Sequence, residues 1–150
     1  MAVEQAVPGS EQRMTFRLLS YWNRVRGSKS MPALSDINIA EITEMYHFSF
    51  TISLGANESE HEISYFGPKL AEAFGIDYTG YTLEEALNDV FVNNTIGFYH
   101  KVVAEKQPHS ESSEFFSESR EVRYRSIILP CSSNDNDVDY VIGTTNYKIF

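Results

Sequence analysis

The sequence predicts an α+β fold: a five-stranded antiparallel sheet with helices on one face, preceded by an amphipathic helix. Three observations lead to this prediction. Helical and strand patterns follow one another in the order helix, two strands, several helices, three strands. Every strand connection except the helical one has hairpin length, which favours antiparallel pairing. The 150 residues suit one domain with one core, so the strands are expected to share a single sheet.

The composition restricts the classes of partner. A net charge of −9 opposes binding to nucleic-acid phosphates. No apolar run approaches the ~20 residues needed to span a bilayer, and residues 1–10 lack the basic start and apolar stretch of a secretory signal. The single cysteine, Cys131, has no partner for an internal disulfide. We therefore expect a cytoplasmic protein without a membrane or nucleic-acid partner.

The chain is expected to begin with a flexible segment, residues 1–10, followed by a domain over residues 11–150 whose first element is a helix over 11–27. In that helix apolar side chains recur at three- and four-residue steps beside a row of arginines. Aromatic residues and arginine are enriched at interface hot spots. The candidates for a protein interface, including a homodimer, are Leu18, Tyr21, Trp22 and Val25. Alternatively, these residues pack on the chain's own sheet.

The next elements are a β-hairpin and two short helices. Residues 46–54 and 60–66 alternate with a period of two around a turn at 55–59, which predicts the hairpin. Pro68 is suited to the first helical position and Gly75 to the left-handed residue that ends a helix. A short helix is therefore expected between them.

A tight turn and a second short helix are expected after Gly75. Asp77 and Gly80 suit the first and last places of a type I turn. Thr82 and Glu85 have the spacing of a capping box, in which each residue satisfies a backbone amide of the other. The sequence thus predicts that a helix begins at Thr82.

The remaining pattern predicts one long helix and three strands. Apolar residues form a helical stripe over 90–105, and Pro108 ends the helix. Strands are expected at 111–118, 121–130 and 138–149. Gly143, inside the last strand, indicates a bulge or a close approach of the backbone.

Several local matches accompany this order of elements over about residues 15–148. They are Tyr21-Trp22, Arg26-Gly27, Pro32, Ser35-Asp36-Ile37, Glu41-Ile42, Gly67, Phe74-Gly75, Asp77, Thr79-Gly80 and the helix end from Tyr99 to Pro108. With them the chain resembles the PAS superfamily and, within it, a bacterial family of stand-alone PAS-like signalling proteins. The resemblance implies helices cupped over one face of the sheet, signalling through small-molecule or protein contacts, and no catalytic residue.

The resemblance also implies a ligand pocket between the sheet and the helices. Aromatic and apolar residues are its candidate lining: Phe50, Tyr65, Phe74, Phe91, Phe98, Tyr99, Tyr124 and Ile142. Ligand sites are usually apolar with few polar groups. The alternative is that these side chains simply fill the core, because protein interiors are close-packed.

Bound cofactors are not expected, and haem and flavin are disfavoured. Some PAS sensors hold haem through a histidine on the long helix, but His100 lies opposite the apolar stripe and should face water. Light-sensing members of the family that the chain resembles carry a reactive cysteine in an Asn-Cys-Arg type helix, whereas Cys131 follows Pro130 in an expected loop.

A metal site is not expected either. Asp135, Asp137 and Asp139 resemble the opening of a calcium loop. The glycine and glutamate that such a loop needs at its sixth and twelfth positions are replaced by Tyr140 and Asn146. A solvated hairpin loop is the favoured interpretation.

The expected function is that of a non-catalytic, cytoplasmic sensory or regulatory module, because phosphate loops, nucleophile motifs and paired-carboxylate signatures are absent from the sequence. It would act in trans on another signalling protein, modulated by a small molecule in the pocket. The alternative is a cone-shaped α+β small-molecule-binding protein or enzyme. That fold places its long helices first, whereas here a strand pair precedes the long helix.

Overall fold

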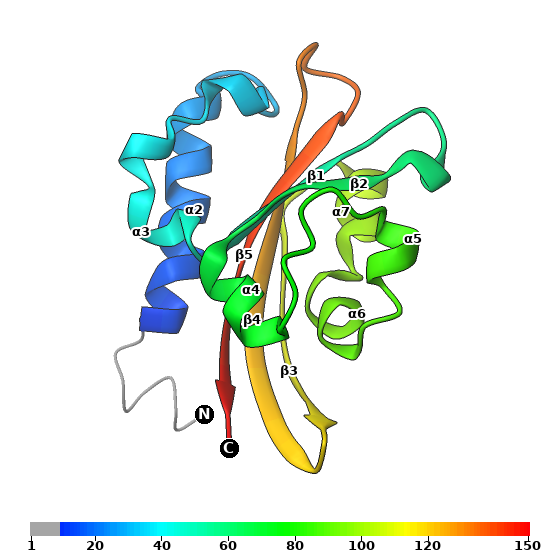
Figure 1. Cartoon of the computed structure of the whole chain (residues 1–150). Coiled ribbons are helices and arrows are strands. Elements are labelled where there is room, and N and C mark those ends of the chain that lie inside the picture. The colour runs from blue at the N-terminus through cyan, green and yellow to red at the C-terminus, as the bar shows by residue number, and fades with distance from the viewer. Residues whose placement is uncertain (1–9) are drawn as a thin grey trace.

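The computed structural model describes residues 10–150, with side chains from residue 14 onward. Its centre is a five-stranded antiparallel sheet in the order β2-β1-β5-β4-β3 (Figure 1). The strands are β1 (Ser49–Ser53), β2 (Glu62–Phe66), β3 (His109–Ser117), β4 (Arg120–Cys131) and β5 (Tyr140–Ile149). The predicted sheet is confirmed: the early hairpin and the three late strands join because β5 pairs with both β1 and β4.

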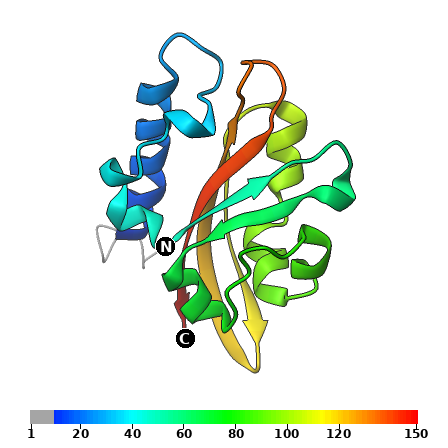
Figure 2. The ribbon, with the colours of Figure 1, turned by 45° about the horizontal axis from the view of Figure 1, so that its top comes forward.

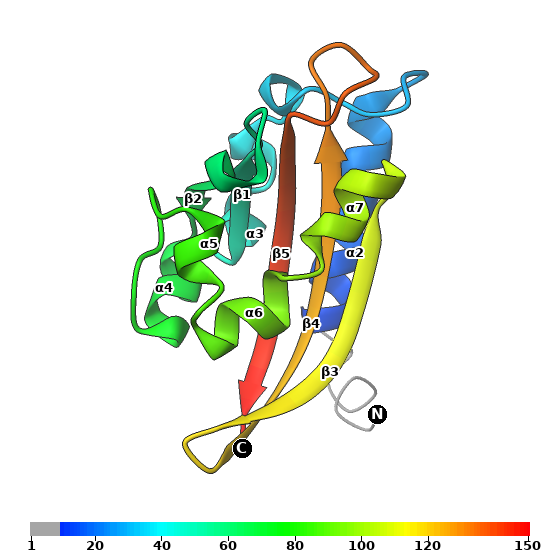
Figure 3. The ribbon, with the colours of Figure 1, turned by 90° about the vertical axis from the view of Figure 1, so that its right-hand side faces the viewer.

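Helices cover both faces of this sheet. The helices are α2 (Ser10–Arg26), α3 (Thr43–Tyr46), α4 (Pro68–Phe74), α5 (Leu83–Ala86), α6 (Val90–Ile96) and α7 (Tyr99–Glu105), with 3-10 turns η1 (Leu34–Asp36), η2 (Ile39–Glu41) and η3 (Glu58–Glu60). Helices α4 to α7 lie on one side of the sheet, whereas α2 and α3 lie on the other (Figures 1 and 3). The predicted flexible segment lies outside the described residues except for Ser10, which begins α2. No helix in residues 10–150 has the length and apolar character needed to cross a bilayer.

The sheet therefore separates two hydrophobic cores. The first, the α7-side core, contains Phe50, Ile52, Ile63, Phe66, Leu70, Phe74, Tyr78, Leu83, Ala86, Val92, Ile96, Tyr99, Val102, Ile128 and Val141. The second, the α2-side core, contains Leu18, Tyr21, Trp22, Met31, Ile42, Met45, Ile127, Leu129, Cys131 and Ile142. Strand β4 contributes to both cores because successive side chains of a strand point to opposite faces.

The apolar stripe of α2 belongs to the second core. Leu18, Tyr21 and Trp22 are buried there, and Val25 packs against them. The indole Nε1–H of Trp22 donates a hydrogen bond of 2.8 Å to the carbonyl oxygen of Pro130 on β4. Of the two alternatives from the sequence, packing on the chain's own sheet is the one observed. These four side chains therefore do not form an exposed interface.

The predicted single helix over 90–105 is wrong, because α6 ends at Ile96 and α7 begins at Tyr99. Phe98 has a ψ of 5°, outside helical geometry, and its carbonyl accepts from Lys101 in a tight turn. The two short helices bury separate sets of side chains, Val92 and Ile96 from α6 and Tyr99 and Val102 from α7. Residues of the predicted apolar stripe are buried, but the helix is interrupted within the stripe.

The turn after α4 also differs from the prediction. Pro68 begins α4, and Gly75 ends it with a φ of +84°, as predicted. Gly80, however, has a φ of +92°, and the turn's backbone bond runs from Tyr81 to Tyr78. Gly80 is thus the third residue of a turn that needs a left-handed conformation, not the last residue of a type I turn. The amide of Gly80 also donates to the Ile63 carbonyl, so this segment covers the outer edge of β2.

Gly143 allows a close approach inside the sheet, as its place in a strand indicated. A Cβ atom at this position would lie 2.5 Å from Cζ of Phe50 and 2.6 Å from the carbonyl oxygen of Ile127. The ring of Phe50 therefore occupies the space that a side chain on β5 would need.

Candidate functional site

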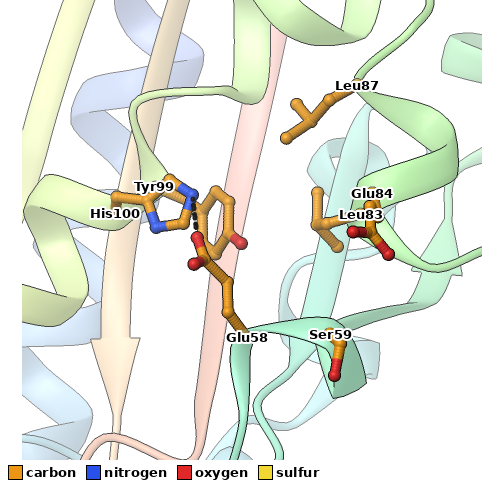
Figure 4. Close-up of a pocket in the computed structure, with 7 residues that line it drawn as sticks. All are labelled: Glu58, Ser59, Leu83, Glu84, Leu87, Tyr99 and His100. Carbon is orange, nitrogen blue, oxygen red and sulfur yellow. Dashed lines mark ion pairs between the residues drawn. The ribbon is translucent and has the colours of Figure 1, made fainter.

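A pocket of about 380 Å³ lies on the α7 side of the sheet. It opens between η3, α5 and the start of α7 (Figure 4). Its lining residues are Glu58, Ser59, Leu83, Glu84, Leu87, Tyr99 and His100. Two leucines and a tyrosine ring supply the apolar surface, and carboxylates, a hydroxyl and an imidazole surround it (Figure 4).

A local sequence signal positions α5, which forms one wall of this pocket. The predicted capping box at α5 is confirmed: the amide of Glu85 donates to Oγ1 of Thr82, and the amide of Thr82 donates to Oε1 of Glu85. The amide of Leu83 also donates to the carbonyl of His61, which ties α5 to the start of β2. Helix α5 is only four residues long, so these bonds and the burial of Leu83 and Ala86 together hold it in place.

A hydrogen bond between His61 and Tyr99 lies beside the pocket. Nδ1 of His61 is 2.8 Å from the hydroxyl of Tyr99, whose side chain is buried in the α7-side core. Burial, followed by the charge of Glu58, raises the pKa of Tyr99 above its ordinary value. Burial, followed by the neighbouring His100, lowers the pKa of His61 below 6.5. Both groups are therefore predominantly neutral near pH 7.

His100 is exposed at the rim of the pocket, as its place opposite the apolar stripe predicted. Nε2 of His100 lies 3.1 Å from Oε2 of Glu58, and the two form an ion pair when the imidazole is protonated (Figure 4). The His100 ring also lies against Tyr99, with ring centroids 4.1 Å apart. The rim thus places an imidazole next to a carboxylate and against an aromatic ring.

The arrangement is suited to recognition of a small molecule. The carboxylates of Glu58 and Glu84 and the hydroxyl of Ser59 can accept hydrogen bonds, while Leu83 and Leu87 offer an apolar wall. Among the side chains that the structure describes, from residue 14 onward, no group of three or more His, Cys, Asp or Glu has the arrangement of a metal site.

The sequence-predicted pocket residues divide between the two faces of the sheet. Phe50, Phe74 and Tyr99 are buried in the α7-side core, and Phe91 and Phe98 pack against it. Tyr124 extends this aromatic group through Phe115, whose ring also contacts Phe91. Of the eight predicted residues, only Tyr99 lines the pocket of Figure 4.

Tyr65 and Ile142 lie on the opposite face, so their assignment to a pocket under α4–α7 is corrected. Ile142 belongs to the α2-side core, because its neighbour Val141 faces the other side. A register shift between Thr51 and Ile52 on β1 changes the pairing with β2. Simple alternation along β2 therefore does not predict which face of the sheet each of its side chains occupies.

The aromatic side chains under α4–α7 fill space by contacting one another. Phe66 and Phe74 have ring centroids 5.3 Å apart, Phe74 and Phe91 are 5.1 Å apart, and Phe91 and Phe115 are 5.2 Å apart. Such tilted and edge-on pairs are favourable arrangements for aromatic rings. At these residues the observed packing is the close-packed alternative that the sequence left open.

Sequence reasoning missed Glu58, Ser59, Leu83, Glu84 and Leu87. Two of these lie in the predicted turn after β1, and the other three on or just after α5. The capping box at Thr82 was the one available signal, because it indicated where a short helix would begin. It could not show that this helix faces η3.

Cys131 is the last residue of β4 rather than part of a loop, which corrects the expectation. Its thiol is fully buried, and burial raises its pKa to about 12. The thiolate needed for nucleophilic chemistry is therefore scarce at neutral pH. In the nearby loop, Asp135 accepts hydrogen bonds from the amides of Ser30 and Met31, so it connects the β4–β5 hairpin to the segment after α2.

Comparison with known proteins agrees with this architecture. The sequence model of the PAS domain family matches residues 10–146, and no curated protein matches the chain. A variant of the fungal photoreceptor Vivid has a similar structure at 11% identity and a TM-score of 0.50, covering 92% of this chain and 99% of that one. A light-oxygen-voltage domain studied with a flavin analogue gives 11% identity and a TM-score of 0.51, covering 75% of this chain and 86% of that one.

A third similar structure is the PAS domain of BvgS from Bordetella pertussis, with 10% identity and a TM-score of 0.48, covering 72% of this chain and 83% of that one. At such identities structural likeness concerns the fold alone. The family match over most of the chain decides against the cone-shaped alternative. From the sequence match and the sheet with its surrounding helices, it follows that this chain belongs to the PAS domain family.

Proposed function

We propose that this PAS domain is a non-catalytic sensory module that binds a small molecule in the pocket between η3, α5 and α7 and signals its presence through α2. The observation that carries the proposal is the position of β4 between these two elements. Ile128 of β4 packs on the α7 side, while Ile127 and Leu129 pack on the α2 side. A shift of α7 on ligand binding would therefore act on the strand that holds α2.

The lining of the pocket supports a ligand with a protonated amine on a small apolar body. Glu58 and Glu84 place two carboxylates at the pocket, and Leu83 and Leu87 supply an apolar wall. A positive ligand is attracted by both carboxylates, whereas an anionic ligand of the same shape is repelled. The net charge of −9 acts in the same direction.

The exposed side of α2 supports contact with a second copy of the chain. Phe16 is 66% exposed and belongs to a groove of about 400 Å³ whose lining also includes Arg17, Arg24, Glu41 and Met45. Arginine and aromatic residues are the side chains enriched at interface hot spots. Because the groove carries both signs of charge, two copies related by a two-fold axis can pair arginine with glutamate.

In this proposal the homodimer acts on another signalling protein in the cytoplasm. The ligand biases the dimer because it binds one arrangement of α7 and β4 better than another. The free, buried thiol of Cys131 is compatible with the reducing compartment that the proposal assigns.

Ligand class is tested by calorimetric titration with phenethylamine and with phenylacetate, two compounds of similar shape and opposite charge. We expect the protein to bind the amine and not the acid. Glu84→Gln should weaken binding of the amine about tenfold, which corresponds to about 1.4 kcal/mol, whereas Glu114→Gln on the exposed strand β3 should leave it unchanged. Equal affinity of wild type and Glu84→Gln, or no binding of the amine, contradicts the proposal.

The dimer contact is tested by sedimentation velocity over a range of protein concentrations. Phe16 and Phe116 are 66% and 68% exposed and lie on α2 and β3, so they form a matched pair. Phe16→Glu is expected to abolish a concentration-dependent dimer that Phe116→Glu retains. A wild-type protein that sediments as a monomer at every concentration rejects the dimer.

A further inference from the structure

A second pocket lies on the other face of the sheet. Its volume is about 260 Å³, and it opens between the outer faces of β1, β2 and β5 and the segment that contains η1 and η2. Its lining residues are Leu34, Ile37, Ile39, Tyr46, Thr51, Ser64, Tyr65, Tyr140 and Ile142. Figure 2 shows α2 and the segment after it on one side of the sheet and α6 and α7 on the other. The second pocket is therefore separated by the sheet from the pocket of Figure 4.

The chemical character of this pocket differs from that of the first. Its lining contains no Asp, Glu, Lys, Arg or His. Burial raises the pKa of Tyr46 above its ordinary value and that of Tyr65 to about 12, so both phenols are neutral at physiological pH. A charged ligand would have to leave water without an opposite charge to compensate it, which is costly. The pocket therefore selects an uncharged occupant.

Aromatic rings form part of its surface. The rings of Tyr46 and Tyr65 are stacked, with centroids 4.0 Å apart and planes inclined by 8°. The hydroxyl of Tyr65 donates to the backbone carbonyl of Tyr46, which holds the pair in place. A flat, aromatic ligand fits against this pair of rings and the aliphatic walls beside it. Because the two tyrosines are already held in place, they lose little side-chain freedom when such a ligand binds.

Polar groups that can orient a bound ligand also line this pocket. Thr51 and Ser64 share a hydrogen bond of 2.6 Å between their hydroxyls. Tyr46 and Tyr140 also line the pocket, and each carries a phenol hydroxyl that can donate or accept a hydrogen bond. A ligand that carries one donor or acceptor can bond to such a hydroxyl while its rings contact the apolar walls.

The volume limits the size of the occupant. An apolar cavity of about 150 Å³ holds one benzene molecule, so 260 Å³ leaves room for a second ring. We infer that this pocket binds a small, uncharged aromatic molecule of one or two rings that carries a hydrogen-bonding group. Ile39 is 47% exposed, and contact with such a ligand would remove part of that apolar surface from water.

Tyr21 of α2 forms a hydrogen bond with the segment that lines the binding site. The amide of Asn38, between Ile37 and Ile39, donates a hydrogen bond of 2.8 Å to the hydroxyl of Tyr21. A ligand against Ile37 and Ile39 therefore contacts the segment that is bonded to α2. This second site acts on α2 directly and needs no ligand in the pocket of Figure 4.

The probe for this site is indole, which is uncharged, has two rings and carries one N–H donor. Titration is followed by NMR of the tyrosine rings. We expect saturable shifts of Tyr46, Tyr65 and Tyr140, and no shift of Tyr99 on the other face. Indole-3-carboxylate, the charged counterpart, should bind at least tenfold more weakly.

Two isoleucines provide a matched pair of variants. Ile39 lines the pocket and Ile76 does not, and their exposures are 47% and 44%. Ile39→Asp should weaken indole binding at least tenfold, whereas Ile76→Asp should leave it unchanged. The inference is overturned if indole does not saturate, if it shifts Tyr99 instead, or if both variants bind it equally. Failure of phenethylamine to bind leaves this test unaffected, because the two probes report on different faces of the sheet.

Discussion

Tyr99 and His100 are neighbours in the chain, yet their side chains have opposite environments. Tyr99 is buried and shares a hydrogen bond with His61, whereas His100 is exposed and faces Glu58. Because both residues lie at the start of α7, the first turn of this helix brings a buried phenol and an exposed imidazole to the same pocket. The alternation of burial along α7 could be predicted from the apolar stripe; the partners, which come from the β1–β2 hairpin, could not.

The lowered pKa of His61 predicts a pH dependence of stability. Between that lowered value and 6.5 the unfolded chain binds more protons at this histidine than the folded chain does. The contribution is therefore present above pH 6.5, and the free energy of unfolding decreases as the pH falls through 6.5. His61→Gln should make the dependence shallower, and His47→Gln, which removes an exposed histidine, should not. Urea unfolding between pH 5 and pH 8 measures this, and equal slopes for the two variants would refute it.

The short helices form the pocket, and their boundaries depend on capping more than on propensity. Helices of four to seven residues are unstable alone, so α4, α5, α6 and α7 are held by their ends and by packing. Pro68, Gly75 and Thr82 marked such ends correctly. The break at Gly97 and Phe98 was missed because the apolar pattern continues across it, although a glycine inside a helical pattern weakens the helix.

The cap of α5 should be important for both stability and the pocket. Thr82→Ala removes the oxygen that accepts from the amide of Glu85, and the expected loss is about 1 kcal/mol in the free energy of unfolding. Thr82→Ser retains a hydroxyl and should lose much less. Urea denaturation provides the values, and NMR of the Leu87 methyl groups shows whether the pocket wall moves. Equal stability of the Ala and Ser variants would show that the cap is dispensable.

Across the whole molecule, β4 connects the two cores. It pairs with β3 and β5, and its side chains enter the α7-side core and the α2-side core alternately. Helix α2 is therefore part of the folded domain, although its pattern alone was equally compatible with an interface between copies. The proposed route from ligand to α2 depends on this shared strand.

The bond between α2 and β4 can be tested by Trp22→Phe. The substitution leaves the buried carbonyl of Pro130 without the indole donor, and an unsatisfied buried acceptor costs about 1–3 kcal/mol. We expect a loss in that range, measured by guanidinium denaturation followed by circular dichroism. Phe16→Leu, a change at the exposed side of the same helix, should have little effect. A stable Trp22→Phe variant would mean that packing alone holds α2.

The sequence by itself determined the strands, most helix ends and the fold class, because alternation, capping residues and glycines act over a few neighbouring positions. The glycine at position 143 indicated a close approach in the same way, and in the structure the ring of Phe50 is the group that approaches it. Only the tertiary structure decided which face of the sheet each strand residue occupies, because the bulge between Thr51 and Ile52 and the pairing of β5 involve distant segments. For the same reason, only the tertiary structure showed that Tyr65 and Ile142 lie on the opposite face from the other pocket candidates. It also showed that α2 packs in a second core on that face.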